Sequence, residues 1–118
     1  MTEVTTVVDG YIAMWNETDP ERRRFIIEHT WAEDGSYVDP HAEVAGADGL
    51  DALVAAVQEQ FPGHRFVLAA GPDAHHDRMR FTWQLVAESG EAVATGIDFA
   101  TVADDGRLRA VTGFLEAA

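Results

Sequence analysis

The chain contains no cysteine and no lysine. Without cysteine it can form no disulfide and offers no thiolate metal ligand, so nothing favours an oxidising compartment. It also lacks a run of the roughly 20 apolar residues that a membrane helix needs. Its start, Met1-Thr2-Glu3-Val4, does not resemble a secretory signal. We therefore expect a cytoplasmic protein without a membrane anchor.

Positive charge is scarce. Eight basic residues, all arginine, stand against 21 acidic ones, which gives a net charge of −13 at pH 7. Such a surface repels the phosphates of nucleic acids and anionic lipids, so we expect neither as a partner. Neutral ligands, or ligands held in a pocket shielded from the surface, are easier to accommodate. The length of 118 residues and the 47% hydrophobic content fit one domain, residues 1–118.

Three segments have the apolar spacing of an amphipathic helix. The second is predicted to start at Thr18-Asp19-Pro20-Glu21, which has capping-box spacing and an early proline, and to run to about Trp31. The third is expected to end at Pro62-Gly63. The inward positions are Val4, Val7, Val8, Tyr11, Ile12 and Trp15 in the first helix, Phe25, Ile26 and His29 in the second, and Leu50, Leu53, Val54, Val57 and Phe61 in the third.

The remaining segments alternate with the period of a half-buried strand. A short strand is predicted at 36–39, where Pro40 stops it, and four more follow the third helix. Turns are expected at Gly71-Pro72-Asp73, Glu88-Ser89-Gly90 and Asp104-Asp105-Gly106. The order ααβαββββ predicts an α+β fold with a mostly antiparallel sheet.

Two aspartates lie inside strand-like segments: Asp39 in Tyr37-Val38-Asp39-Pro40 and Asp98 in Gly96-Ile97-Asp98-Phe99. A carboxylate in apolar surroundings is costly as the anion, so it is paired, hydrogen-bonded or protonated. Pairs of this kind often mark acid/base sites.

Each aspartate also has a simpler interpretation. Asp before proline is a common turn element, so Asp39 could be only a polar strand end. Strict alternation would turn Ile97 and Phe99 toward the core and Asp98 toward solvent.

In order and spacing, these segments resemble the nuclear-transport-factor-2-like (NTF2-like) fold, within its ketosteroid-isomerase and SnoaL-like polyketide-cyclase branch. The resemblance covers nearly the whole chain. It rests on residues 11–16 of the first helix, on the two aspartate segments and on Asp105-Gly106-Arg107-Leu108. It implies a cone in which a strongly bent sheet wraps around helices and encloses a deep pocket.

The resemblance also implies roles for three residues. Asp39 matches a carboxylate general base, and Tyr11 matches a hydroxyl that donates to the developing enolate oxygen. Asp98 matches a protonated carboxyl that donates a second bond, which requires it to face inward. Ile97 and Phe99 would then lie on the outer face of the sheet, where this branch often forms a homodimer. Without the resemblance, the position of Tyr11 on the buried stripe favours a core tyrosine with a satisfied hydroxyl.

Further residues are candidates for the pocket wall. Tyr37 shares a strand face with Asp39, and His41 could orient or replace Asp39 as the base or lie free in the loop. The other candidates, which could instead be plain core residues, are Trp15, Phe61, Phe66, Met79, Phe81, Trp83 and Phe114. His75 and Asp77 would share a strand face, but no third ligand is placed beside them, so we expect no metal and no cofactor.

The function that the resemblance implies is proton transfer next to a carbonyl, in an isomerisation or cyclisation of a hydrophobic substrate. The alternatives are a non-catalytic binder of a small apolar ligand, an epoxide hydrolase and a structural or assembly module. Asp77-Arg78 lacks the Arg-x-Asp order of the epoxide hydrolases of this fold. No phosphate-binding loop, dinucleotide fingerprint or Gly-x-Ser-x-Gly motif is present.

Overall fold

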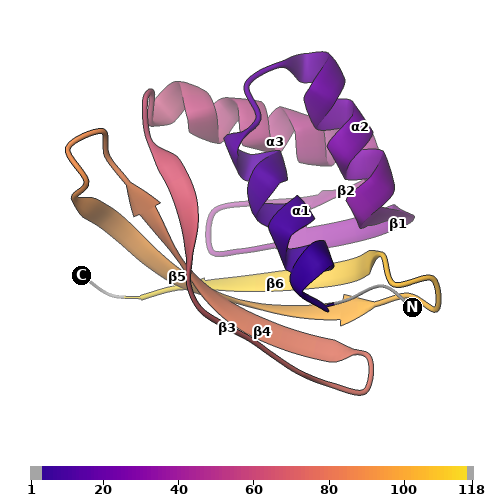
Figure 1. Ribbon diagram of the computed structural model, residues 1–118. Helices are drawn as coiled ribbons and strands as arrows, with labels where there is room; N and C mark the ends of the chain where they lie inside the picture. The colour runs from indigo at the N-terminus through magenta and orange to yellow at the C-terminus, as the bar shows by residue number, and fades with distance from the viewer. Residues whose placement is uncertain (1–3, 117–118) are drawn as a thin grey trace.

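The computed structural model describes residues 4–116 and contains three helices and six strands within that range (Figure 1). The helices are α1 (Val4–Asn16), α2 (Pro20–Thr30) and α3 (Gly46–Gln60). The strands are β1 (Trp31–Val38), β2 (Glu43–Ala45), β3 (Arg65–His75), β4 (Arg78–Val86), β5 (Ala92–Val102) and β6 (Leu108–Leu115). The α+β prediction is confirmed.

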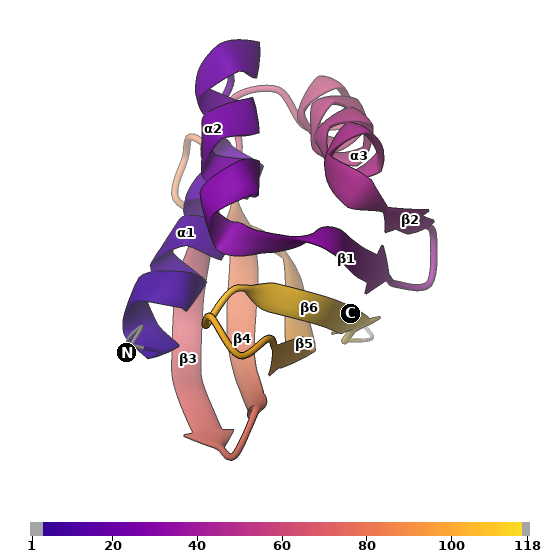
Figure 2. The same ribbon diagram turned by 90° about the vertical axis from the view of Figure 1, so that its right-hand side faces the viewer.

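All six strands belong to one sheet in the order β2-β1-β6-β5-β4-β3. Every neighbouring pair is antiparallel except β1 and β6, which run parallel. The sheet is strongly bent, and the helices lie on its concave side (Figures 1 and 2). The short β2 was not predicted. It follows the loop after Pro40 and pairs with β1, with Val44 opposite Tyr37.

The first strand starts earlier than the sequence indicates. Helix α2 ends at Thr30, and Trp31 already belongs to β1. The strand was predicted only from residue 36, and the pairing of β1 with β6 shifts register between Trp31 and Ser36. A side chain at Gly35 would meet the Trp31 ring at 2.7 Å, so glycine allows the strand to continue over the indole.

The turn predicted at Gly71-Pro72-Asp73 is wrong, because β3 runs through it to His75. The pairing of β3 with β4 shifts register twice, between Leu68 and Asp73, so extra residues are absorbed as bulges without ending the strand. Proline is tolerated there because β3 is an edge strand. The reversal comes at His76 and Asp77.

Helix α2 also packs differently from its predicted pattern. Phe25 is 60% exposed and stacks on the exposed His29, whose ring centroid lies 4.0 Å away. The buried positions include Arg23 and Ile27. Arg23 was missed because an arginine is not expected in a core; here its guanidinium bonds to Asp51 at 2.6 Å. Ile26 is half-buried, as its position in the pattern suggests.

The first helix follows its pattern closely. Val7, Val8, Tyr11 and Trp15 are buried together with Met14, and they pack against the inner face of the sheet. On β4 the inward face carries Met79, Phe81 and Leu85, as alternation predicts. No helix within residues 4–116 is long and apolar enough to cross a membrane.

Candidate functional site

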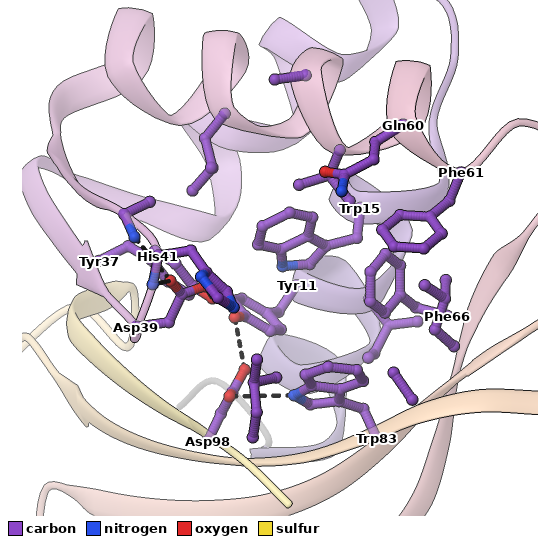
Figure 3. A pocket seen from close by; sticks show the side chains of 18 residues that line it. Tyr11, Trp15, Tyr37, Asp39, His41, Gln60, Phe61, Phe66, Trp83 and Asp98 are labelled. Carbon is purple, nitrogen blue, oxygen red and sulfur yellow. Dashed lines mark hydrogen bonds between the residues drawn. The ribbon is translucent and has the colours of Figure 1, made fainter. Parts of the chain in front are cut away.

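A cavity of about 470 Å³ lies between helices α1 and α3 and the concave face of the sheet (Figure 3). This volume falls within the range of about 300–1,000 Å³ that is usual for ligand pockets. The wall is mostly apolar, and helix α3 contributes Leu53, Ala56 and Val57 to it. Six aromatic rings line it, from Tyr11, Trp15, Tyr37, Phe61, Phe66 and Trp83. Two carboxyl groups, from Asp39 and Asp98, form its polar end.

Asp98 points into the cavity from β5 and is only 2% exposed. The Tyr11 hydroxyl lies 2.6 Å from its Oδ2, and the Trp83 indole N–H donates to its Oδ1 at 3.1 Å. Burial raises the pKa of this carboxyl, and the nearby charge of Asp39 adds to the rise. The two hydrogen bonds oppose that rise but do not cancel it.

The inward face of β5 explains how a carboxyl comes to lie there. Gly96, Asp98 and Ala100 are buried, while Phe99 is 43% exposed. The resemblance therefore gave the right orientation for Asp98, and strict apolar alternation gave the wrong one. Gly96, one of its two small neighbours on this face, leaves room for the Trp83 indole beside the carboxyl.

Asp39 lies at the end of β1, where the chain turns toward β2. Its Oδ2 accepts a hydrogen bond of 2.6 Å from the Tyr37 hydroxyl. Its Oδ1 accepts two backbone N–H bonds, from His41 at 2.8 Å and Ala42 at 2.9 Å. Three donors suit a carboxylate, which only accepts hydrogen bonds. Asp39 is half-buried, so solvent and ligand both have access to it.

The two carboxyls face each other across a glycine. Strand β6 lies between β1 and β5, and its Gly113 is paired with Asp98. A Cβ at Gly113 would lie 2.8 Å from Asp98 Oδ1, 3.4 Å from the Tyr37 hydroxyl and 3.5 Å from Asp39 Cβ. The missing side chain therefore lets acidic groups from two non-adjacent strands share one end of the cavity. A glycine inside a predicted strand was the signal for this approach, and the sequence reasoning did not use it.

Both tyrosine hydroxyls stay protonated. Burial raises the pKa of Tyr11 far above its usual value, and the neighbouring Asp98 adds to the effect. Burial likewise raises the pKa of Tyr37, and its hydrogen bond to Asp39 is the second cause of the rise. Each hydroxyl therefore remains a hydrogen-bond donor across the physiological pH range.

Solved structures similar to this one identify the family. A SnoaL-like family protein from Agrobacterium tumefaciens str. C58, named as a candidate isomerase, is 43% identical and superposes with a TM-score of 0.92. The match covers 99% of this chain and 100% of that one. The chain belongs to the SnoaL-like family. No protein-family model and no curated protein matches it.

More distant structures share the fold. An NTF2-like protein of unknown function from Exiguobacterium sp. 255-15 is 19% identical, with a TM-score of 0.74, over 95% of this chain and 99% of that one. A candidate SnoaL-like polyketide cyclase from Jannaschia sp. CCS1 is also 19% identical, with a TM-score of 0.70, over 95% of this chain and 86% of that one. The NTF2-like fold assigned from the sequence is confirmed.

In this SnoaL-like chain most of the predicted pocket residues meet at one place. The three predicted catalytic residues, Tyr11, Asp39 and Asp98, line the same cavity. So do the predicted wall residues Trp15, Tyr37, His41, Phe61, Phe66 and Trp83. Residues that the sequence reasoning left out of the site include Gln60, Leu115 and the α3 positions named above.

Three predicted wall residues lie elsewhere. The placement of Phe114 at the pocket is wrong: Gly113 takes the inward position on β6, so the next side chain points outward and is 54% exposed. Met79 and Phe81 are buried in the core beside the cavity, with the Phe81 ring centroid 5.3 Å from that of Tyr11.

The other polar motifs of the sequence lie away from the cavity. His75 and Asp77 do not share a strand face, because Asp77 belongs to the turn after β3. Asp77 instead pairs with Arg78 at 2.7 Å. Within residues 4–116, no cluster of three or more histidines and carboxylates is arranged to hold a metal ion.

Proposed function

We propose that this SnoaL-like chain is an enzyme that moves a proton at a carbon next to a carbonyl group of a small, largely apolar substrate. One observation carries the proposal. Two carboxyls in different environments, Asp39 with three donors and Asp98 buried, face each other across Gly113 at the end of an apolar cavity. Two carboxyls held in unlike surroundings within one cavity are typical of an acid/base pair.

The roles follow from access and from hydrogen bonding. Asp39, half-buried and open to the cavity, removes the proton as general base. The electron pair left behind moves onto the carbonyl oxygen, where the buried pair of Tyr11 and Asp98 stabilises the negative charge. Asp39 then returns the proton to a different carbon, which completes an isomerisation. No external oxidant, reductant or cofactor takes part in these steps.

Typical rate effects indicate how much each of these few groups would contribute to the reaction. A placed general base typically contributes about 10²–10⁴-fold to the rate. Each donor to the developing oxyanion contributes about 10²–10³-fold. The remaining walls bind the apolar part of the substrate and keep water away from it. The likeness to a candidate isomerase and to a candidate polyketide cyclase supports this reaction class, in which isomerisation and ring closure share the same enolate.

The test is the conversion of 5-androstene-3,17-dione, a β,γ-unsaturated ketone, to its conjugated isomer, followed by ultraviolet absorbance. We expect Asp39→Asn to lower kcat by about 10²–10⁴-fold. Asp34→Asn serves as the matched control, because Asp34 is an exposed carboxyl on the same strand. Equal turnover by wild type and Asp39→Asn would contradict the assignment of the base.

A second candidate function is non-catalytic binding of an apolar molecule. It is favoured by the fact that the polar groups already satisfy one another: Tyr11 bonds to Asp98, and Tyr37 bonds to Asp39. Among the described residues, no buried side-chain polar atom lacks a partner. This function predicts that Asp39→Asn binds 5-androstene-3,17-dione as tightly as wild type and that neither protein converts it.

A further inference from the structure

The indole of Trp83 occupies the space above Gly96. The two residues are paired across β4 and β5. A Cβ at Gly96 would overlap with Cζ2 and Cε2 of the indole and would lie 2.9 Å from its Nε1. Only a residue without a side chain leaves room for the ring in this position. Because Asp98 is two residues further along β5 on the same face, this seat brings the indole N–H to its carboxyl.

The chemistry of the indole then distinguishes the two oxygens of Asp98. A tryptophan N–H donates a hydrogen bond and cannot accept one. Oδ1, which lies 3.1 Å from Nε1, must therefore be an acceptor. In a neutral carboxyl the carbonyl oxygen is the stronger acceptor, so this N–H favours Oδ1 as the carbonyl oxygen and places the proton on Oδ2, which lies 2.6 Å from the Tyr11 oxygen. A tyrosine hydroxyl can accept this proton in a hydrogen bond while it donates its own to another group.

We infer that Trp83, seated on Gly96, holds the proton of neutral Asp98 on Oδ2, so that Asp98 acts on the substrate through the Tyr11 hydroxyl and not directly. This inference rests on the proposed function. Asp98 Oδ2–H donates to the Tyr11 oxygen, and the Tyr11 O–H turns to the carbonyl oxygen of the substrate. Asp98 keeps its proton throughout, since Asp39 performs the only proton transfer. Trp83 is a positioning residue.

The arrangement strengthens the donor that meets the substrate. A hydroxyl that accepts a hydrogen bond becomes a better donor, because neighbouring hydrogen bonds polarise one another in a medium of low dielectric constant. Tyr11 is 2% exposed and lines the cavity, so its hydroxyl operates in such a medium. Without Trp83 the Asp98 proton could reside on either oxygen, and the carboxyl would support Tyr11 for only part of the time.

A double-mutant cycle tests this chain of contacts with 5-androstene-3,17-dione as substrate. We expect Trp83→Phe to lower kcat by about tenfold, the effect of losing one oriented hydrogen bond, with a smaller change in KM. In a Tyr11→Phe background the same substitution should have almost no further effect on kcat, because its route to the substrate is already cut. An equal loss of kcat in both backgrounds, or a change confined to KM, would show that Trp83 only packs against the substrate.

Infrared spectroscopy tests the proton position without turnover. At a pH where most carboxyls are ionised, the C=O stretch of protonated Asp98 is identified by its loss in Asp98→Asn. Trp83→Phe should move this band to higher frequency, because Oδ1 loses its donor. Phe66→Leu is the control. The ring centroids of Phe66 and Trp83 lie 5.2 Å apart, but Phe66 has no polar side-chain atom, so the band should stay in place.

The two measurements separate the two claims. An unmoved band in Trp83→Phe overturns the inference whatever the activity. A shifted band in a protein that does not turn over the ketone overturns the proposed function and leaves the position of the proton established. If Trp83→Phe folds poorly, Gly96→Ala displaces the indole while keeping it in the chain, and it should shift the band in the same direction.

Discussion

At the residue scale, the feature on which the proposed chemistry rests is a carboxyl that is buried although burial disfavours its charged form. Asp98 is almost fully buried, and the two donors that reach it do not restore its ordinary pKa. Asp39, across Gly113, is half-buried and holds three donors. The same residue type therefore occupies two different environments in one cavity, and this difference supports the two roles that we propose.

The raised pKa of Asp98 makes stability depend on pH. Because the folded protein binds this proton more tightly than the unfolded chain, the stabilising contribution is complete below the ordinary value of about 3.9 and is lost as the pH rises through the folded pKa. Asn carries no such proton. Asp98→Asn should therefore match wild type most closely at low pH and become more stable than wild type toward neutral pH.

Urea unfolding of both proteins at a series of pH values measures this difference. Asp34→Asn, at an exposed position, should show no comparable change. A stability difference between Asp98→Asn and wild type that stays constant from pH 4 to pH 7 would show that burial does not strain the charged form of Asp98.

At the element scale, the site depends on how neighbouring segments begin and meet. Helix α2 begins after Asp19, whose side chain accepts a hydrogen bond of 2.9 Å from the backbone N–H of Arg22, and Pro20 takes the first helical position. This start places Arg23, which bonds to Asp51 of α3 and to the carbonyl of Glu17 after α1. The three helices are thereby tied together above the cavity.

Removing the cap should weaken the fold by a predictable amount. Asp19→Ala is expected to lower the free energy of unfolding by about 1 kcal/mol, because a helix N–H loses its partner. Asp9→Ala, at an exposed position within α1, should change it by less than about 0.5 kcal/mol. Urea denaturation monitored by circular dichroism measures both; equal effects of the two substitutions would contradict the role of the cap.

The sequence predicted elements where a single pattern dominates and failed where contacts between segments decide. The stripe of Val7, Val8 and Tyr11 leaves little choice, so α1 was predicted correctly. The bulges that carry β3 through Gly71 depend on pairing with β4, which no local pattern shows. In the same way, the exposure of Phe114 follows from the inward position of Gly113, opposite Asp98.

The site was predictable only in part, for the same reason. Apolar alternation would have turned Asp98 outward, and only the resemblance to a family indicated its inward position. The hydrogen bond between Trp83 and Asp98 depends on the space that Gly96 leaves for the indole. That space exists only once folding has brought β4 and β5 together. Trp83 was therefore predicted as a wall residue, and its N–H was not recognised as a donor to the acid.

At the scale of the whole molecule, the outer face of the sheet is unusually apolar. Phe99 and Phe114 lie on adjacent strands with ring centroids 6.0 Å apart, and both are more than 40% exposed. Val93, on the same face of β5 as Phe99, is also exposed. A chain of net charge −13 has ample polar residues for its surface, so an aromatic pair there favours contact with another protein surface. We propose that this face forms a homodimer.

Sedimentation equilibrium should therefore give a mass near twice the 12.9 kDa of one chain. Phe114→Glu should shift the protein toward the monomer, because it places a further charge in the interface. Higher salt should favour the dimer, since it screens the repulsion between two acidic chains. Phe25→Glu is the matched control, because Phe25 is exposed on α2, away from the sheet. A wild-type protein that stays monomeric would rule out the dimer.

The central claim is that Asp39 transfers a proton next to a carbonyl, and the exchange of such protons with solvent tests it without requiring the natural substrate. We would follow the α-protons of 2-tetralone in D₂O by nuclear magnetic resonance, with wild type and Asp39→Asn side by side. The account predicts exchange faster than in buffer with wild type and about 10²–10⁴-fold slower enzymatic exchange with the variant. Equal rates with the two proteins, or a wild-type rate no faster than that of buffer, would contradict it.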